Sequence, residues 1–261
     1  MKMLKDFISS KQDELLYLKK LKSLKQIQDE AFELQKKYKP RNFTAVFADR
    51  NSIKLIAEIK LASPSHGLLT HLSYIDLAKI YAESVADAVS VLTEKKYFNG
   101  DLKFLREVKN IIPQPILRKD FIIDEYQVYE TFLAGADAFL LIAAILTKKQ
   151  LSNFISLGKK FKLAVLVEIH NKEDLAKTLS CGGEMIGINN RDLKTMKIDL
   201  TTSERLVTLI PSGKIVVSES GINTAEDVQY VKNLGINGIL VGSSIVKAAD
   251  SLKKIIELKS I

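Results

Sequence analysis

The stretch AGADAFLLIA at residues 134–143 contains the pattern that decides the fold of this chain. Gly135 follows a helix-like segment and supplies the left-handed residue with which helices commonly end. The run at 138–143 is apolar on both faces, which is typical of a strand covered on both sides in a parallel sheet. The stretch LGINGILVG at 234–242 repeats this order of glycine turn and apolar run.

Apolar runs of this kind occur eight times and alternate with amphipathic, helix-like segments. The runs lie at residues 55–60, 89–94, 115–121, 138–143, 163–169, 185–190, 214–220 and 238–242. The helix-like segments lie at 74–84, 102–110, 125–134, 148–160, 172–180, 203–209 and 224–234, and a last helix lies at 244–258. Units of roughly 20–35 residues have the length of a strand–helix pair, and eight of them favour a closed (β/α)8 barrel, the TIM barrel, over an open sheet.

Residues 1–54 precede the first run and form an N-terminal helical extension. Residues 1–39 have apolar side chains at helical spacing with lysines between them, and Pro40 ends the predicted helix. No linker rich in Pro, Gly or Ser interrupts the eight units. We therefore expect residues 1–261 to form a single barrel domain, with the extension packed over one end.

The composition is that of an ordinary globular chain with a basic surface. The 261 residues are 46% hydrophobic and 27% charged, with a formal net charge of +8. The lysines are spread along the chain, so we expect a solvated surface and neither nucleic acid nor a membrane as partner. The longest apolar run is about eight residues, far short of a membrane span. The single cysteine, Cys181, excludes an intrachain disulfide and fits a cytoplasmic location.

Charged side chains gather at the carboxyl ends of the predicted strands, where the active sites of (β/α)8 barrels lie. Two-residue alternation turns Glu58 and Lys60 to the same face, and it separates Lys119 from both of its neighbours. We expect these three residues and Glu168 to face one mouth and to tune one another's pKa values for acid–base work. The alternative is a structural ion-pair network, although branched apolar side chains normally fill a barrel interior.

Small residues follow the last two strands, as Ser220-Gly221 and Gly242-Ser243. Barrels of this kind often bind phosphate there, through backbone N–H groups that glycine leaves accessible. Ser63, in the loop after the first strand, can add a hydroxyl contact, and a plain turn is the alternative for that loop. The sequence therefore predicts a phosphorylated small-molecule substrate.

Several classes of site are excluded by what the sequence lacks. The three histidines, His66, His71 and His170, have no Asp or Cys at matching metal-ligand spacing, so we expect no metal. The glycine-rich dinucleotide motif, the Walker loop and the serine-hydrolase elbow are also missing from the sequence. The sequence therefore does not favour a nucleotide-dependent enzyme or a serine hydrolase.

Longer motifs match one known family in order along the chain. They are EIKLASPSHG at 58–67, SVLTE at 90–94, YFNG at 97–100, LRKDF at 117–121, VE at 167–168, INNRDL at 188–193 and ESGI at 219–222. On these motifs the chain resembles the indole-3-glycerol phosphate synthase family over essentially its whole length, the N-terminal extension included.

The resemblance implies a reaction. The family converts 1-(2-carboxyphenylamino)-1-deoxyribulose 5-phosphate into indole-3-glycerol phosphate, with loss of CO₂ and water, in tryptophan biosynthesis and without a metal or cofactor. By this resemblance Lys119 is the general acid at the substrate carbonyl. Glu168 stabilises the cationic intermediate and serves as an acid–base group, and Glu58 and Lys60 complete the dehydration machinery. Which of the two lysines protonates which oxygen stays open.

The resemblance also implies the groups that bind the substrate. Asn189 and Arg191 would orient it, with Arg191 suited to its carboxylate. The phosphate would be held by Ser220, Gly221, Gly242 and Ser243, with help from Lys60 and Ser63. The wall around the aromatic ring would be formed by Phe98, Phe121, Leu140, Leu193 and Val241.

Two other functions stay open at this point. Another phosphate-binding barrel enzyme, such as phosphoribosylanthranilate isomerase, would need a Cys/Asp pair, and Cys181 lies in a predicted helix-end turn. A non-catalytic binder of anionic ligands would suit the basic charge but leaves the inward lysines and glutamates unexplained. We expect a monomer, and association with other tryptophan-pathway enzymes stays open.

Two positions depart from the family's pattern: Leu61 replaces a basic residue and His66 replaces a lysine. Leu61 should face away from the mouth. We predict that His66 weakens closure of the first loop or makes closure pH-dependent, because imidazole titrates near neutral pH. A His66→Lys variant should therefore differ in KM and in the pH profile of its steady-state kinetics; unchanged values would contradict the prediction.

Overall fold

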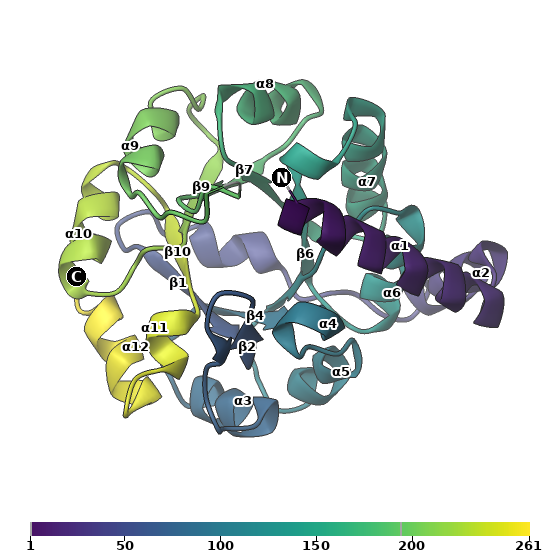
Figure 1. Cartoon of the computed structure of the whole chain (residues 1–261), viewed down its shortest axis with the longest axis horizontal. Helices are drawn as coiled ribbons and strands as arrows, with labels where there is room; N and C mark the ends of the chain where they lie inside the picture. Colours follow the sequence, from purple (N-terminus) through teal and green to yellow (C-terminus); the bar gives the residue numbers. More distant parts are fainter. Residues whose placement is uncertain (1, 194) are drawn as a thin grey trace.

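The computed structural model describes residues 2–193 and 195–261. In it, parallel strands close into an eight-stranded barrel ringed by helices (Figure 1). The strands are β1 (Lys54–Ile59), β4 (Ala88–Leu92), β5 (Ile116–Lys119), β6 (Ala138–Ile142), β7 (Ala164–Ile169), β8 (Met185–Asn189), β9 (Ile215–Glu219) and β10 (Gly238–Val241). The predicted (β/α)8 barrel is confirmed, and no barrel strand extends more than one residue beyond its predicted run.

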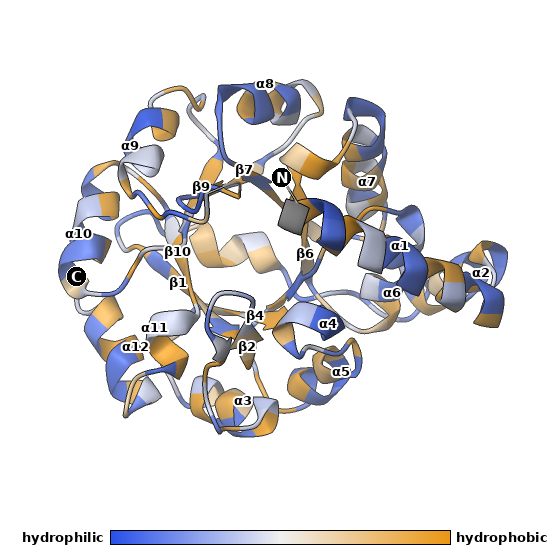
Figure 2. Cartoon of the chain, in the orientation of Figure 1, coloured by the Kyte–Doolittle hydropathy of each residue, from blue (hydrophilic) through white to orange (hydrophobic). Residues whose placement is uncertain are grey.

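Helices connect successive strands and turn their apolar faces to the barrel (Figure 2). They are α3 (Tyr74–Ala82), α4 (Lys95–Phe98), α5 (Lys103–Lys109), α6 (Glu125–Leu133), η2 (Ala143–Ile145), α7 (Lys148–Lys160), α8 (Lys172–Ser180), α9 (Thr201–Val207), α10 (Ala225–Asn233), α11 (Ser243–Val246) and α12 (Ser251–Lys259). The single last helix predicted at 244–258 is wrong. Asp250 caps a new helix there by accepting a hydrogen bond from the Lys253 N–H, so α12 begins separately from α11. Among the described residues, no helix is long and apolar enough to cross a membrane.

The N-terminal extension contains two helices in place of the one predicted over residues 1–39. α1 (Lys2–Leu21) and α2 (Leu24–Gln35) are separated by Ser23. The Ser23 hydroxyl accepts from the Gln26 N–H while the Gln26 side chain accepts from the Ser23 N–H. This reciprocal capping box starts a new helix and explains the break.

The extension covers both ends of the barrel, whereas the sequence predicted one. Phe7 of α1 packs against Phe121 at the carboxyl end, with ring centroids 4.9 Å apart, and α1 lies across that end in Figure 1. Phe43 and Phe47 of the short helix η1 (Phe43–Phe47) join the apolar cluster inside the barrel from the opposite end. That residues 1–261 form one domain stays a prediction.

Side chains alternate between two apolar clusters on either side of the barrel wall. Inward-facing residues such as Ile56 and Leu140 fill the barrel, and their neighbours along the strands pack beneath the helices. Leu61 packs against the outer cluster, as predicted. The inner cluster forms a floor below the charged residues at the strand ends.

We predict that Asp137 fastens the extension to the barrel. Its fully buried carboxylate accepts from the backbone N–H groups of Arg41 at 2.6 Å and Ile116 at 2.8 Å, and it pairs with Lys109 at 2.5 Å. Asp137→Ala removes the acceptor of all three donors and should lower the free energy of unfolding by about 3–5 kcal/mol in urea titrations.

The control is Asp29→Ala, which removes an exposed ion pair with Lys25 on α2. Exposed pairs contribute little, so this variant should lose less than about 1 kcal/mol. Equal losses in the two variants would contradict the role given to Asp137.

Candidate active site

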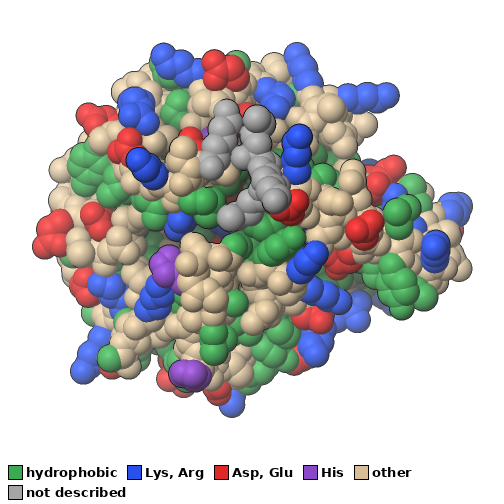
Figure 3. All heavy atoms as spheres, in the orientation of Figure 1, with side chains coloured by type: hydrophobic (Ala, Val, Ile, Leu, Met, Phe, Trp, Pro, Cys, Tyr) green, Lys and Arg blue, Asp and Glu red, His purple; other side chains and the backbone are tan. Residues whose placement is uncertain are grey.

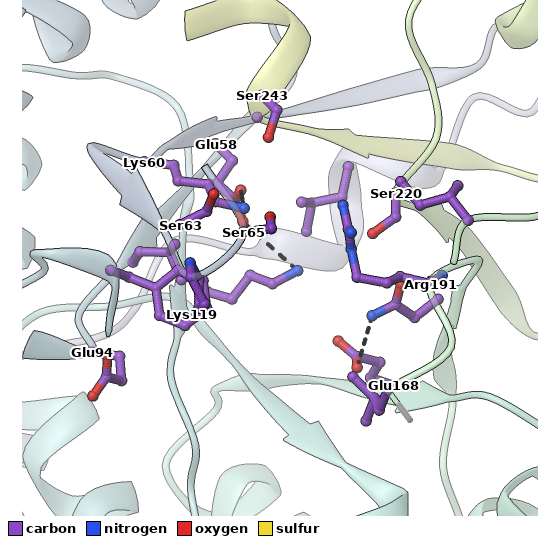
Figure 4. Close-up of a pocket in the computed structure, with 18 of the residues that line it drawn as sticks. Glu58, Lys60, Ser63, Ser65, Glu94, Lys119, Glu168, Arg191, Ser220 and Ser243 are labelled. Atoms are coloured by element: carbon purple, nitrogen blue, oxygen red, sulfur yellow. Dashed lines mark hydrogen bonds and ion pairs between the residues drawn. The ribbon is translucent and has the colours of Figure 1, made fainter. Parts of the chain in front are cut away.

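Every residue that the sequence assigned to catalysis or substrate binding lines one pocket at the carboxyl ends of the strands. These residues are Glu58, Lys60, Ser63, Phe98, Lys119, Phe121, Leu140, Glu168, Asn189, Arg191, Leu193, Ser220, Gly221, Val241, Gly242 and Ser243. Figure 3 shows this face of the molecule, with lysines and arginines distributed around it among aspartates and glutamates. Figure 4 shows how the labelled side chains converge.

Lys119, at the end of β5, lies among three carboxylates. Its ammonium group is 2.6 Å from a Glu219 oxygen and 3.7 Å from a Glu58 oxygen. Burial lowers the pKa of Lys119, but the attraction of Glu219, Glu58 and Glu168 outweighs burial and raises that pKa above its usual range. Lys119 is therefore an ammonium ion at neutral pH.

Lys60 reaches into the same pocket and is shifted in the opposite direction. Its Nζ lies 3.7 Å from a Glu58 oxygen and 5.5 Å from the centre of the Phe98 ring. Burial lowers the pKa of Lys60, the positive charges of Lys119 and Arg191 lower it further, and Glu58 offsets only part of this. Lys60 is thus the lysine of this pair that gives up a proton more readily.

Glu168, at the end of β7, is held by the neighbouring strand. Asn189 donates a hydrogen bond to Glu168 Oε1 at 3.0 Å (Figure 4), and Asn189 Oδ1 accepts from the Arg191 N–H at 3.0 Å. Burial raises the pKa of Glu168, but interactions with His170, Lys119 and Asn189 lower it below its usual range. Glu168 is therefore a carboxylate in the pocket.

One end of the pocket is built from a sharp turn after β9. Ser220 and Gly221 both have positive φ angles, of 66° and 88°. A side chain at Gly221 would bring its Cβ to 2.7 Å from Ile198, so both the backbone conformation and the space require glycine. The Asn190 amide donates to the carbonyl oxygens of Glu219 and Ser220 and holds this turn.

Two further serines, Ser63 and Ser243, line the pocket. Ser243, at the start of α11, lies at the top of Figure 4, and Glu94 lies at the lower left. Ser63 Oγ is buried and has no hydrogen-bond partner among the described residues. A buried hydroxyl without a partner is costly unless a ligand supplies one.

The other end of the pocket is aromatic. The rings of Phe98 and Phe121 have centroids 6.4 Å apart, and Phe7 lies 6.3 Å and 4.9 Å from them. Phe7 and Leu4, both from α1, also line the pocket. The sequence analysis missed these two residues, because nothing in the local pattern of α1 shows which strand end it meets.

The loop predicted after the first strand contains a short hairpin. Strands β2 (Ala62–Ser63) and β3 (Gly67–Leu68) pair antiparallel. His66 lies in the turn, 2.8 Å from the Ser65 hydroxyl, and both residues line the pocket. The predicted effect of His66 on closure of the first loop therefore concerns the hairpin of β2 and β3.

A family model described as indole-3-glycerol phosphate synthase matches residues 4–258. The chain belongs to the indole-3-glycerol phosphate synthase family. It is similar to the indole-3-glycerol phosphate synthase of Thermoanaerobacter sp., with 47% identity over 215 residues that make up 82% of each chain. It is also similar to that of Clostridium kluyveri, with 43% identity over 258 residues and 97% of each chain.

Solved structures show the same fold at much lower identity. The 3-hexulose-6-phosphate synthase of Salmonella typhimurium superposes with a TM-score of 0.63 and 16% identity, over 80% of this chain and 97% of that chain. At this identity the likeness concerns the barrel alone.

Glu219, which pairs with Lys119, is a third residue that the sequence analysis did not assign to the site. Two-residue alternation puts it on the same face as Val217, which belongs to the inner cluster. Burial raises the pKa of Glu219, and its neighbours Glu168 and Glu58 raise it further against the opposing effect of Lys119. That alternation could have pointed to Glu219, but its pairing with Lys119 could not be read from the sequence.

We predict that Gly187 of β8 provides the space for the Glu219 carboxylate. A Cβ at Gly187 would collide with Glu219 Oε1. Gly187→Ala should displace that carboxylate from Lys119, lower the free energy of unfolding by about 1–3 kcal/mol and reduce activity. Thermal unfolding and steady-state kinetics would measure both effects.

A double-mutant cycle supplies the control. Glu219→Ala removes the atom that the new methyl group meets, so adding Gly187→Ala to that background should cost much less than it does in the wild type. The same cost in both backgrounds would show that Gly187 has another role.

Proposed function

We propose that this chain catalyses the ring closure for which its family is named, converting 1-(2-carboxyphenylamino)-1-deoxyribulose 5-phosphate into indole-3-glycerol phosphate. The observation that carries the proposal is the order of groups in the pocket. Ser and Gly turns form one end, lysines and carboxylates form the middle, and phenylalanine rings form the other end. The substrate has its phosphate, its reacting carbonyl and its aromatic ring in the same order.

Phosphate binding is assigned to Ser220, Gly221, Gly242 and Ser243. These residues offer backbone N–H groups and hydroxyls at the ends of β9 and β10, the usual phosphate site of such barrels. Ser63 adds the buried hydroxyl that has no partner among the described residues. Binding the phosphate here leaves the aromatic ring to pack between Phe98, Phe121, Leu140, Leu193 and Val241.

Ring closure needs the aromatic carbon held against the carbonyl carbon and the carbonyl oxygen stabilised as it gains negative charge. Arg191 and Asn189 orient the substrate, with Arg191 toward its carboxylate. The Lys119 ammonium group hydrogen-bonds to the carbonyl oxygen and protonates it as the bond forms. Glu168 stabilises the positive charge left on the ring and nitrogen, and loss of CO₂ restores the aromatic system.

Dehydration then removes the hydroxyl group formed from the carbonyl. The leaving oxygen must gain a proton and the ring system must lose one. Lys60, with its lowered pKa, suits proton transfer to that oxygen, and Glu58 lies between the two lysines as the acceptor. Water leaves and indole-3-glycerol phosphate remains.

Other features of the enzyme stay predictions. We expect a cytoplasmic monomer that needs no metal or cofactor, and association with other tryptophan-pathway enzymes is open. The rival isomerase activity would need a cysteine in the pocket, and Cys181 caps the carboxyl end of α8, away from the residues that line it.

The test is a fluorescence assay for indole-3-glycerol phosphate with the wild type and Lys119→Ala. We expect kcat to fall by a factor of about 100 to 10,000, because the variant loses its proton donor at the carbonyl. Lys95→Ala, an exposed lysine near the mouth, is the control and should keep wild-type activity. Circular dichroism would show that both variants fold.

Three outcomes are informative. Near-wild-type turnover by folded Lys119→Ala would overturn the role of Lys119. A wild type that isomerises phosphoribosylanthranilate and forms no indole product would favour the rival enzyme. A wild type inactive on both, with salt-sensitive RNA binding, would favour a binding protein.

A further inference from the structure

His170 is a buried histidine between two carboxylates, directly behind the catalytic pocket. Its Nε2 lies 3.2 Å from Glu168 Oε1, and its Nδ1 lies 3.7 Å from Asp174 Oδ2. The side chains of all three residues are almost completely buried, with 11% of the His170 side chain exposed. His170 does not itself line the pocket, so it reaches the substrate only through Glu168.

The start of α8 positions Asp174, the carboxylate on the other side of His170 from Glu168. Asn171 caps the helix by accepting from the Asp174 N–H at 2.8 Å. Asp174 Oδ2 in turn accepts from the backbone N–H of His170 at 3.2 Å. The first turn of α8 therefore fixes the position of the Asp174 carboxylate.

The charges around His170 favour the imidazolium form. Burial lowers the pKa of His170, but Asp174 from α8 and Glu168 from β7 outweigh burial and raise that pKa to about 10. Glu168 also faces Lys119 of β5 and lies near Glu219 of β9. Glu168 therefore lies between two cations, Lys119 inside the pocket and His170 on the side remote from it.

Both supports of Glu168 act on the same atom. Asn189 donates to Oε1 at 3.0 Å, and His170 Nε2 lies 3.2 Å from Oε1. The Asn189 hydrogen bond restrains the rotation of the carboxylate, and the His170 ring, close to Oε1 without hydrogen-bond geometry, adds a charge and a packing contact at the same oxygen. A carboxylate held by the amide alone would lose part of this restraint.

We propose that His170, anchored by Asp174, is a positioning residue that holds Glu168 in its catalytic orientation from the side remote from the substrate. The proposal rests on the proposed function, because the orientation of Glu168 matters only if Glu168 takes part in ring closure. Removing the imidazolium leaves Glu168 with less restraint and with one fewer neighbouring cation, so its carboxyl group should bind a proton at a higher pH than in the wild type.

The first test needs no activity. The chain has three histidines, so a proton NMR titration of the imidazole signals, with His170→Gln to assign the third signal, is practical. The His170 signal should not titrate between about pH 5 and 8.5 in the wild type, and it should titrate at lower pH in Asp174→Asn. A wild-type His170 signal with an ordinary midpoint near neutral pH would overturn the proposal.

The second test is kinetic. His170→Gln and Asp174→Asn should lower kcat by about tenfold to a hundredfold with little change in KM, because the substrate still binds but Glu168 is misplaced. In His170→Gln the acidic limb of the kcat profile should move to higher pH, since the Glu168 pKa rises when a neighbouring cation is lost; Asp174→Asn keeps the imidazolium at acidic pH and should not show this shift. His71→Gln, an exposed histidine outside the pocket lining, is the matched control and should change neither quantity.

The outcomes separate the two proposals. One outcome is that variants of His170 and Asp174 lose thermal stability and still keep the kcat and pH profile of the wild type. That result would show that the two residues only stabilise the fold, and it would overturn the positioning role. A wild type that makes no indole product would contradict the proposed function instead, and the NMR titration would still decide whether the two carboxylates hold His170 charged.

Discussion

Placing the ammonium group of Lys119 among buried carboxylates is the constraint on which the rest of the structure depends. Its 2.6 Å contact with Glu219 joins residues 100 positions apart in the chain. Removing such charges from water costs several kcal/mol per ion, and the cost is repaid only when geometry and partners are good. The barrel supplies that geometry, because parallel strands that are neighbours or lie across the ring all end at the same level.

The same strand supports a second ion network. Arg118 contacts α6 and pairs at 2.9 Å with Asp120, which lines the pocket and is reached at 2.9 Å by Lys11 of α1. Lys119, between them in the sequence, points inward. The β5 segment therefore places Lys119 in the charged centre of the pocket. Through Asp120 it also holds α1, the helix that brings Phe7 to the aromatic end of the pocket.

What the sequence could predict follows from rules that act over a few residues. Two-residue alternation places Glu58 and Lys60 together, and the glycine turn at Gly135 separates helix from strand, so the barrel, the charged cluster and the phosphate end could be predicted from local rules. The residues around the aromatic ring came from the resemblance to the family. The pairing of Lys119 with Glu219 and the arrival of Phe7 could not be predicted, because they depend on where distant segments meet in the closed ring. The break at Ser23 was missed for a different reason: a polar capping box interrupts an apolar pattern that continues across it.

The two lysines of the pocket differ in their surroundings, and this bears on how they share the work. Lys119 has carboxylates around it and is held as a cation, which suits an oxygen that gains negative charge during ring closure. Lys60 is buried and has Lys119 and Arg191 as neighbours, so its pKa is lowered, which suits proton transfer to the hydroxyl that leaves as water. Glu58 lies 3.7 Å from both ammonium groups. Movement of its carboxylate toward one lysine would raise the pKa of that lysine and let the pKa of the other fall, so in the proposed mechanism Glu58 links the two proton transfers.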